Sequence, residues 1–220
     1  MSNQRLKEKL AESARYALLR RLAPVLRHNL AGSLQPLSMM AILLEKRLQN
    51  PSPDLAALAR NSSQLNTAAR EASSACMSLV TWLAPNISDL VTVTAGISDV
   101  TDLVTTELGF KGYTLVNQIG EVPAEIPRSL TRHVFMAALI ALTDATVAPA
   151  SVIIEARLIN KELLLTISIQ TSPGDVLSSG VPAYRHLDWD DVQALAEFES
   201  VQLTHIANRV ELRCPFNAPA

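Results

Sequence analysis

The first third of the chain carries apolar residues at alternating spacings of three and four. The first run is Leu30, Leu34, Leu37, Ala41, Leu44 and Leu48, and the second is Leu55, Leu58, Ser62, Leu65, Ala69, Ala72, Cys76, Leu79 and Leu83. This repeat is the heptad pattern of helices that pack along a seam. The link between the two runs, "QNPSPD", is too short for anything but antiparallel neighbours. The pattern predicts a helical hairpin.

The ends of these helices follow from local signals. We expect the first helix to reach upstream to about Leu6, with a kink or break near Pro24, because proline lacks a backbone N–H. Ser52 suits the N-cap of the second helix, Pro53 its first position, and Asp54 its positive end.

A different pattern follows Pro85, where we expect the second helix to end. Strands are predicted over 90–97, 112–119, 151–159, 162–170 and in a last hairpin over 201–216; helices are predicted over 98–110 (with Ser98 as a possible N-cap), 127–145 and 188–199. The order is an α+β sandwich with its helices on one face of the sheet. The predicted domains are a hairpin over residues 1–85 and an α/β domain over 86–220.

Apolar side chains outside the seam indicate a partner for the hairpin. Met39, Met40, Ile42 and Leu43 lie off the heptad positions, and two helices alone bury little surface. We therefore expect two hairpins to pair into a four-helix bundle, which makes the protein a homodimer. The alternative is that the C-terminal domain of the same chain covers these residues.

Composition narrows the classes of partner. The chain has 220 residues, a hydrophobic fraction of 48% and a net charge of −2, which argues against general nucleic-acid binding. Residues 1–47 hold nine Lys and Arg against three Glu, whereas the remainder holds ten against eighteen Asp and Glu. The basic N-terminal part favours an acidic partner, although a charged surface is often only solvated.

Two further features bear on location. The most apolar stretch, residues 134–154, contains Asp144 and Pro149 and is typical of a core helix, turn and strand rather than a membrane span. The N-terminus is polar, unlike a signal peptide, so we expect a cytoplasmic protein without membrane contact.

Cys76 and Cys214 have no metal-ligand spacing and fall in apolar patterns, which predicts buried free thiols.

Residues 28–34, "HNLAGSL", resemble the phosphoacceptor box of bacterial two-component histidine kinases, and the hairpin followed by this order of elements resembles their core. His28 falls on the phosphoacceptor histidine and Leu34 on the closing leucine. Asn29 stands where the kinases have an acidic residue, and Gly32 where they have a small polar one. With Leu34 at heptad position a, His28 falls at b, which faces solvent. The alternative is a core histidine.

The helix predicted over 127–145 resembles the asparagine-bearing helix of the kinases' ATP-binding domain. The frame matches at Arg132, Val134, Leu139, Asp144, Ala145 and Thr146. Ala137 and Ala141 occupy the places of the two asparagines. The second asparagine holds the Mg²⁺ that bridges the ATP phosphates, and a methyl group offers no oxygen ligand.

The strand that ends in "QTSPGDV" resembles the one leading to the kinases' Asp-x-Gly-x-Gly box. Thr171 replaces the aspartate that reads adenine, Pro173 and Asp175 replace glycines, and no glycine follows Gly180 to build a phosphate loop. The resemblance therefore implies a kinase-like scaffold that binds no cofactor and no metal and has no ATP-dependent kinase activity. Another ligand for the emptied pocket stays open as an alternative.

The resemblance implies a histidine phosphotransfer protein that moves a phosphoryl group between receiver-domain aspartates. His28 is the expected catalytic residue, with Asn29 and Arg27 in support and with Arg20 and Arg21 docking an acidic receiver. The receiver is expected to supply the Mg²⁺. The alternative is a non-catalytic pseudokinase, a dimeric scaffold or inhibitor that binds a sensor kinase or a response regulator.

Overall fold

The computed structural model describes residues 2–83, 89–174 and 184–218. Pro85, Asp175 and Gly180 lie outside the described residues. The chain forms two compact units, one of residues Ala23–Ala84 and one that combines Met1–Leu22 with Pro85–Ala220. The first 22 residues thus pack with the C-terminal part of the chain, whereas the sequence placed them with the hairpin.

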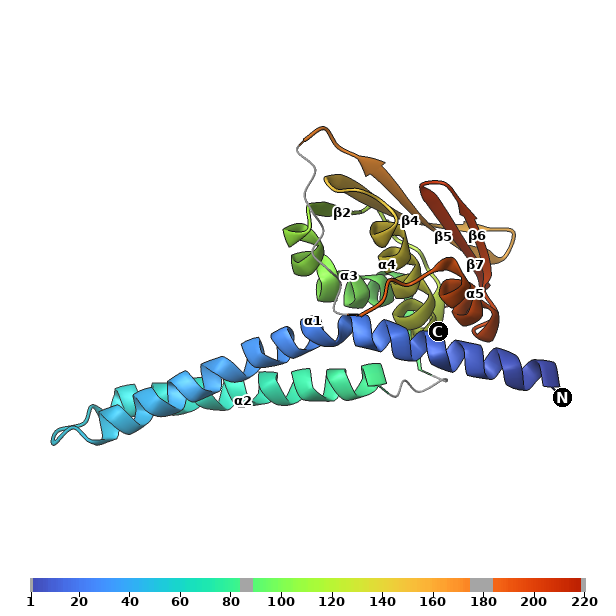
Figure 1. The fold of residues 1–220 in the computed structure, drawn as a ribbon. Helices are drawn as coiled ribbons and strands as arrows, with labels where there is room; N and C mark the ends of the chain where they lie inside the picture. Colours follow the sequence, from blue (N-terminus) through green and yellow to red (C-terminus); the bar gives the residue numbers. More distant parts are fainter. Residues whose placement is uncertain (1, 84–88, 175–183, 219–220) are drawn as a thin grey trace. The chain divides into compact units, whose positions relative to one another are not determined.

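The hairpin consists of α1 (Ser2–Leu48) and α2 (Leu55–Leu83), which run antiparallel within their unit (Figure 1). The helix α1 contains both Pro24 and Pro36 and is continuous through both, so of the expected kink or break near Pro24 there is no break. Val25 and Leu26, directly after the first proline, are buried. Their packing supports the helix across the hydrogen bond that the proline removes.

Asp54, rather than Ser52, caps the start of α2. Its Oδ1 accepts hydrogen bonds from the backbone N–H of Ala56 at 2.9 Å and of Ala57 at 3.1 Å. The bond from Ala57 is the main cause that lowers the pKa of the Asp54 carboxyl below its ordinary value. The N-cap predicted at Ser52 is two residues early, because Asp54 can reach these free N–H groups.

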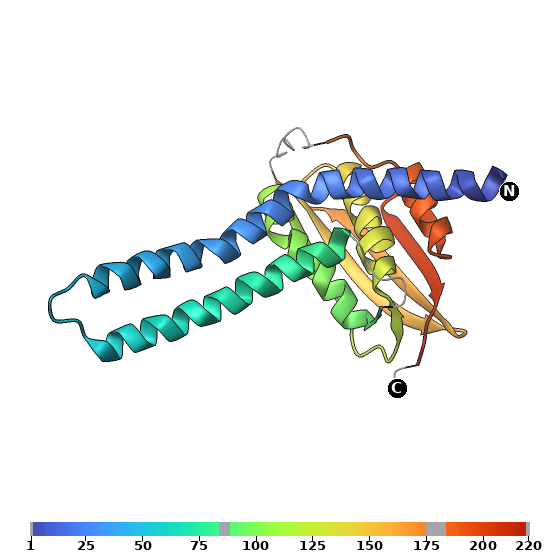
Figure 2. The same cartoon turned by 90° about the horizontal axis from the view of Figure 1, so that it is seen from below.

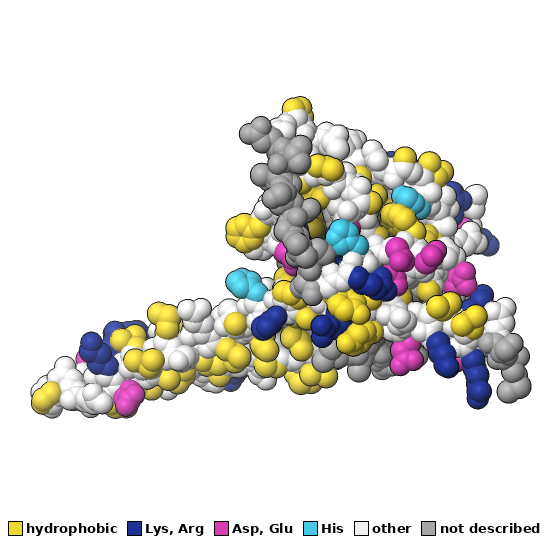
Figure 3. All heavy atoms as spheres, viewed as in Figure 1, with side chains coloured by type: hydrophobic (Ala, Val, Ile, Leu, Met, Phe, Trp, Pro, Cys, Tyr) yellow, Lys and Arg dark blue, Asp and Glu magenta, His cyan; other side chains and the backbone are white. Residues whose placement is uncertain are grey.

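The seam between the two helices uses seven of the fourteen predicted positions whose burial is described. From Leu30 onward the partly or fully buried positions are Leu30, Ser33, Leu37, Met40 and Leu44 on α1 and Ala57, Leu58, Asn61, Leu65, Ala68, Ala72, Ala75, Leu79 and Trp82 on α2. Seven other predicted positions are exposed, namely Leu34, Ala41, Leu48, Leu55, Ser62, Ala69 and Cys76, and the side chain of Leu83 lies outside the described part. Figure 3 shows apolar side chains (yellow) along the surface of this hairpin. One apolar stripe therefore closes the hairpin, and a second one stays open.

The two cysteines differ. Cys76 is exposed, contrary to the expectation from the sequence, because it lies on the open stripe of α2. Cys214 is buried as expected, and burial raises its pKa to about 12.

The other unit contains a five-stranded sheet in the order β2-β4-β5-β7-β6 (Figure 1). Its strands are β2 (Tyr113–Asn117), β4 (Ala150–Ile159), β5 (Glu162–Thr171), β6 (Gln202–Ile206) and β7 (Arg209–Pro215). Only β2 and β4 are parallel among these pairs. Asn160 and Lys161 have φ values of 50° and 67°, which forms the tight turn that the sequence predicted between β4 and β5.

Helices cover one face of this sheet, which confirms the expected α+β arrangement (Figures 1 and 2). They are α3 (Val93–Phe110), a π-helical turn η1 (Leu130–Phe135) that leads into α4 (Met136–Asp144), and α5 (Trp189–Phe198). In both views the first 22 residues of α1 lie across α4 and α5. No helix among the described residues has both the length and the apolar composition that a bilayer span requires.

The strand predicted over 90–97 is mostly helix. Only β1 (Leu90–Thr92) is extended, and it pairs with the short strand β3 (Glu125–Pro127). Thr92 is the N-cap of α3, because its side chain accepts from the N–H of Ala95 at 3.3 Å, so Ser98 is not the cap. The residues that follow bury a helical stripe, Val93, Ile97, Val100, Val104 and Leu108. Burial at this spacing outweighs the β-branched composition.

Gly96 on α3 fits a site with no room for a side chain. A Cβ there would lie 2.9 Å from Thr131 Cγ2 and 2.9 Å from Val91 Cγ1. We expect Gly96→Ala to lower the free energy of unfolding by about 1 kcal/mol, because overpacking costs about 1–3 kcal/mol against a helix-propensity gain near 1 kcal/mol. Gly109→Ala on the same helix is the control, since its Cβ would meet nothing within 4 Å. Denaturant unfolding of both variants decides, and equal stabilisation would contradict the expectation.

Candidate functional site

His28 lies on α1 within the hairpin unit and is exposed, as its heptad phase predicted. Its neighbours Arg27 and Asn29 are exposed too, whereas Val25 and Leu26 are buried. The apolar side of the helix thus faces inward and turns the imidazole toward solvent. The role of His28 as a phosphoacceptor stays a prediction at this point.

A shallow depression of about 470 Å³ surrounds this histidine. It is lined by His28, Asn29, Gly32, Ser33 and Pro36 of α1 together with Glu71 of α2. The Ser33 hydroxyl donates to the Asn29 carbonyl oxygen at 3.0 Å, so it is turned back onto its own helix. The sequence did not indicate Glu71, because heptad spacing alone does not show which α2 residue lies level with His28.

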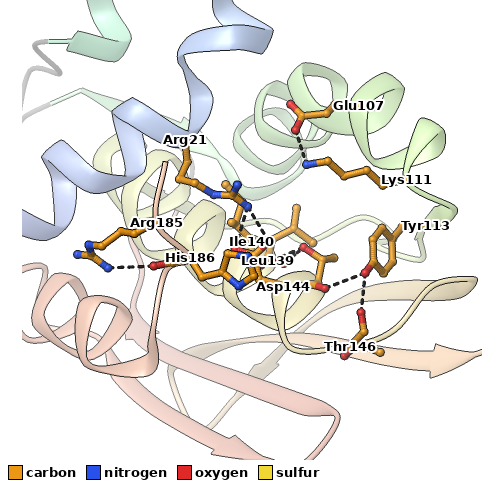
Figure 4. Close-up of polar contacts among 11 residues, drawn as sticks. Arg21, Glu107, Lys111, Tyr113, Leu139, Ile140, Asp144, Thr146, Arg185 and His186 are labelled. Atoms are coloured by element: carbon orange, nitrogen blue, oxygen red, sulfur yellow. Dashed lines mark hydrogen bonds and ion pairs between the residues drawn. The ribbon is translucent and has the colours of Figure 1, made fainter. Parts of the chain in front are cut away.

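The arginines expected to dock a receiver do not share one environment. Arg20 is exposed, with its guanidinium carbon 5.3 Å from the centre of the Tyr184 ring. Arg21 is 8% exposed, and its Nη2 donates to both carboxylate oxygens of Asp144 at 2.6 and 2.8 Å (Figure 4). The expectation that Arg21 docks a partner is therefore corrected, because its guanidinium is paired with Asp144 inside the unit of residues 1–22 and 85–220.

Arg21 seals one side of a small cavity in that unit. The cavity has a volume of about 40 Å³, and its lining includes Arg21, Lys111, Tyr113, Asp144 and His186 (Figure 4). Lys111 is itself paired with Glu107 of α3. Burial, and then the negative charge of Asp144, raise the pKa of the Tyr113 hydroxyl. A cavity of this size has room for a few water molecules but not for a nucleotide.

The helix α4 carries the two alanines that stand where kinases have asparagines. Ala137 is 0% exposed and Ala141 is 2% exposed. The first part of α1 buries a face of small and apolar residues in the same unit, namely Ala11, Ala14, Ala17, Leu18 and Leu22. Two contacts tie it to α5, the Lys7–Glu197 ion pair at 3.1 Å and Arg15 stacked 4.1 Å over the Phe198 ring. The methyl groups of Ala137 and Ala141 are thus buried within this unit.

The residues that carry the kinase-like frame of this helix hold the fold. Val134 and Leu139 are fully buried. Arg132 donates to Asp99 Oδ2 from Nε at 2.9 Å and from Nη2 at 2.7 Å. Thr171, at the end of β5, is exposed. No group of three or more His, Cys, Asp or Glu side chains among the described residues is placed to hold a metal ion.

The other histidines have different surroundings. His133 is 6% exposed, and its Nδ1 lies 3.3 Å from Glu199 Oε1. Ser129 donates to the second oxygen of that carboxylate at 2.7 Å. His205 is exposed and stacks on Trp189 with ring centres 3.7 Å apart.

No protein-family model matches the sequence, and no curated protein matches it. Among solved structures the chain is similar to the histidine kinase AdeS of Acinetobacter baumannii, at 14% identity and a TM-score of 0.43 over 82% of this chain and 97% of that one. It is also similar to the blue-light activated histidine kinase EL346 of Erythrobacter litoralis, at 13% identity and a TM-score of 0.45 over 82% of this chain and 62% of that one. A bacterial phosphotransferase matches at 13% identity and a TM-score of 0.36, over 89% of this chain and 94% of that one. All three likenesses have TM-scores below 0.5.

Proposed function

We propose that this protein is a histidine phosphotransfer protein of a two-component phosphorelay, which accepts and returns a phosphoryl group at His28 without hydrolysing ATP. Its proposed partners are response-regulator receiver domains, and its proposed working form is a cytoplasmic homodimer. The observation that carries the proposal is the exposed His28 at the rim of an open depression.

The surroundings of His28 support access by another protein. Gly32 lies one helical turn further along, and a Cβ at this position would meet nothing within 4 Å. Packing within the chain therefore does not require glycine there. Its effect is to keep the helix surface beside the imidazole low, which suits the approach of a bulky acyl phosphate.

The chemistry asks little of this chain. The lone pair of a neutral imidazole nitrogen attacks the phosphorus of the receiver's aspartyl phosphate, the N–P bond forms, and the P–O bond to the aspartate breaks. The aspartate leaves as a carboxylate, and the imidazole becomes a phosphorylated imidazolium. The receiver contributes the Mg²⁺ that neutralises charge on the transferred group, and the hairpin contributes orientation.

The sealed surface of α4 supports a function without ATP. The residues that stand at the asparagine positions are buried methyl groups, and the remaining cavity of about 40 Å³ is too small for a nucleotide. A kinase would need this surface open and lined with oxygen ligands for Mg²⁺.

Dimerisation predicts a clear response to a charge on the open stripe. Leu34 lies on this stripe and is 44% exposed in the single chain, so Leu34→Glu leaves the hairpin's own seam intact. In a four-helix bundle the new carboxylate would be buried without a partner, and we expect the dissociation constant to rise about a hundredfold or more. Light scattering coupled to size-exclusion chromatography measures the mass, and exposed Gln35→Glu is the control. A monomeric parent protein, or an unchanged Leu34→Glu dimer, would contradict the proposed interface.

Labelling experiments test the proposed function itself. The protein is incubated with phosphoramidate, a small chemical donor of phosphoryl groups to histidine, and separately with phosphorylated receiver domains encoded in its source genome. We expect an acid-labile, base-stable label that mass spectrometry locates at His28 and that an unphosphorylated receiver removes. Tight binding of a receiver with no label on the chain would instead support a non-catalytic scaffold and overturn the proposal.

A further inference from the structure

The hairpin is poor in acidic residues. Between Ala23 and Ala84 the only acidic side chains are Glu45, Asp54 and Glu71. Asp54 is committed to the cap of α2, where its carboxylate accepts two backbone hydrogen bonds. Glu45 lies seventeen residues from His28 along α1, which is about 25 Å at 1.5 Å per residue. Within this hairpin, only Glu71 remains as a carboxylate for the region around His28.

Glu71 lies where such a carboxylate would act. It is the sole acidic residue of α2, it is exposed, and it lines the same depression as His28 and Asn29. Within the described part of the chain, neither the Glu71 carboxylate nor the His28 imidazole has a hydrogen-bond or ion-pair partner. Both side chains are therefore free to turn into the depression, and the low surface at Gly32 leaves the space between them open.

The residue next to His28 does not fill this role. Asn29 has an amide in place of a carboxylate, so it can orient an imidazole through its carbonyl oxygen but brings no negative charge. An imidazole that attacks phosphorus becomes positively charged during the step. A nearby carboxylate stabilises this charge far better than a neutral amide does.

We propose that Glu71 of α2 is the positioning residue for His28. Its carboxylate accepts a hydrogen bond from one imidazole N–H and leaves the other ring nitrogen free to attack phosphorus. This inference rests on the proposed function. As the N–P bond forms and the donor's bond to phosphorus breaks, the imidazole gains a positive charge. The proton on the other nitrogen stays in the hydrogen bond to the Glu71 carboxylate, so no further proton donor or acceptor is needed.

The test uses phosphoramidate as the donor, so that it needs no identified receiver. We expect Glu71→Gln to slow labelling of His28 about tenfold, the scale of one lost charged hydrogen-bond partner. Glu71→Asp should restore most of the rate, because it keeps the charge. Glu45→Gln, the matched loss of an acidic residue at the far end of α1, should label at the parent rate.

A second variant separates positioning from a structural role. Asn29→Asp in the Glu71→Gln background places a carboxylate on the other side of the imidazole, and we expect it to recover the labelling rate. Repair of packing would not follow from a change on a different helix. Thermal unfolding of each variant should match the parent, because both positions are exposed.

The outcomes distinguish the two proposals. No label on the parent His28 ends the proposed function and this inference together. Label on the parent at a rate that Glu71→Gln does not change ends the inference alone. Slow labelling of Glu71→Gln that neither Glu71→Asp nor the added Asn29→Asp corrects would also overturn the role of a positioning carboxylate.

Discussion

Replacing His28 by alanine is expected to remove the phosphoryl label entirely, from phosphoramidate and from phosphorylated receivers alike. The nucleophile is the one group that this chain must supply, and no neighbouring residue can replace the imidazole nitrogen. Because the side chain is exposed, the variant should keep the parent stability to within about 0.5 kcal/mol. Loss of label therefore reports lost chemistry rather than lost fold.

Two other histidines provide matched controls. His186 and His205 are exposed, so their alanine variants should be labelled at the parent level if His28 is the acceptor. His133 is a poor acceptor by geometry, because it is buried and paired with Glu199. A label that survives His28→Ala and disappears in His186→Ala or His205→Ala would transfer the acceptor role to the other unit and contradict the proposed site.

The fold could be predicted from the sequence wherever one signal dominated. The heptad spacing fixed the hairpin, and the exposed face of α1 at His28 followed from its phase. The turn at Asn160 and Lys161 identified β4 and β5, since the residues on both sides alternate with period two. In these segments local preference and burial agree.

The prediction failed where two periods coexist. Residues 90–97 are rich in β-branched residues, which favoured a strand, yet Val93 and Ile97 also begin the apolar stripe of α3. Thr92 is compatible with both structures, because threonine favours strands and also acts as the N-cap of α3. Packing against the rest of the unit decides between them, and a single sequence does not show it.

The candidate site was predictable only in part for a similar reason. Spacing along α1 places Arg21 within two turns of His28, and from the sequence it resembled a docking residue. Its actual partner, Asp144, is 123 residues away in the chain. Nor did the sequence indicate Glu71, because its place beside His28 depends on how α2 is aligned along α1. The spacing of residues along the sequence does not reveal contacts between segments that are far apart in the chain.

Arg21→Ala is expected to lower the free energy of unfolding by about 3–5 kcal/mol, because it leaves the Asp144 carboxylate buried without its partner. The two side chains are only 6% and 15% exposed. Arg21→Leu combined with Asp144→Leu should recover most of this loss, since removing both charges also removes the cost of desolvating them. Denaturant unfolding of Arg21→Leu, of Asp144→Leu and of the double variant gives the coupling between the two side chains.

The same variants decide whether Arg21 acts in the fold or on a partner. Arg20→Ala is the control, and its exposed side chain should cost about 1 kcal/mol or less. A docking residue would slow transfer from a receiver while leaving stability unchanged. We expect the reverse for Arg21: a large loss of stability, with direct labelling of His28 by phosphoramidate unchanged wherever the hairpin stays folded. If Arg21→Ala were as mild as Arg20→Ala in unfolding and yet blocked transfer, the ion pair with Asp144 would not be its main role, and the docking assignment would return.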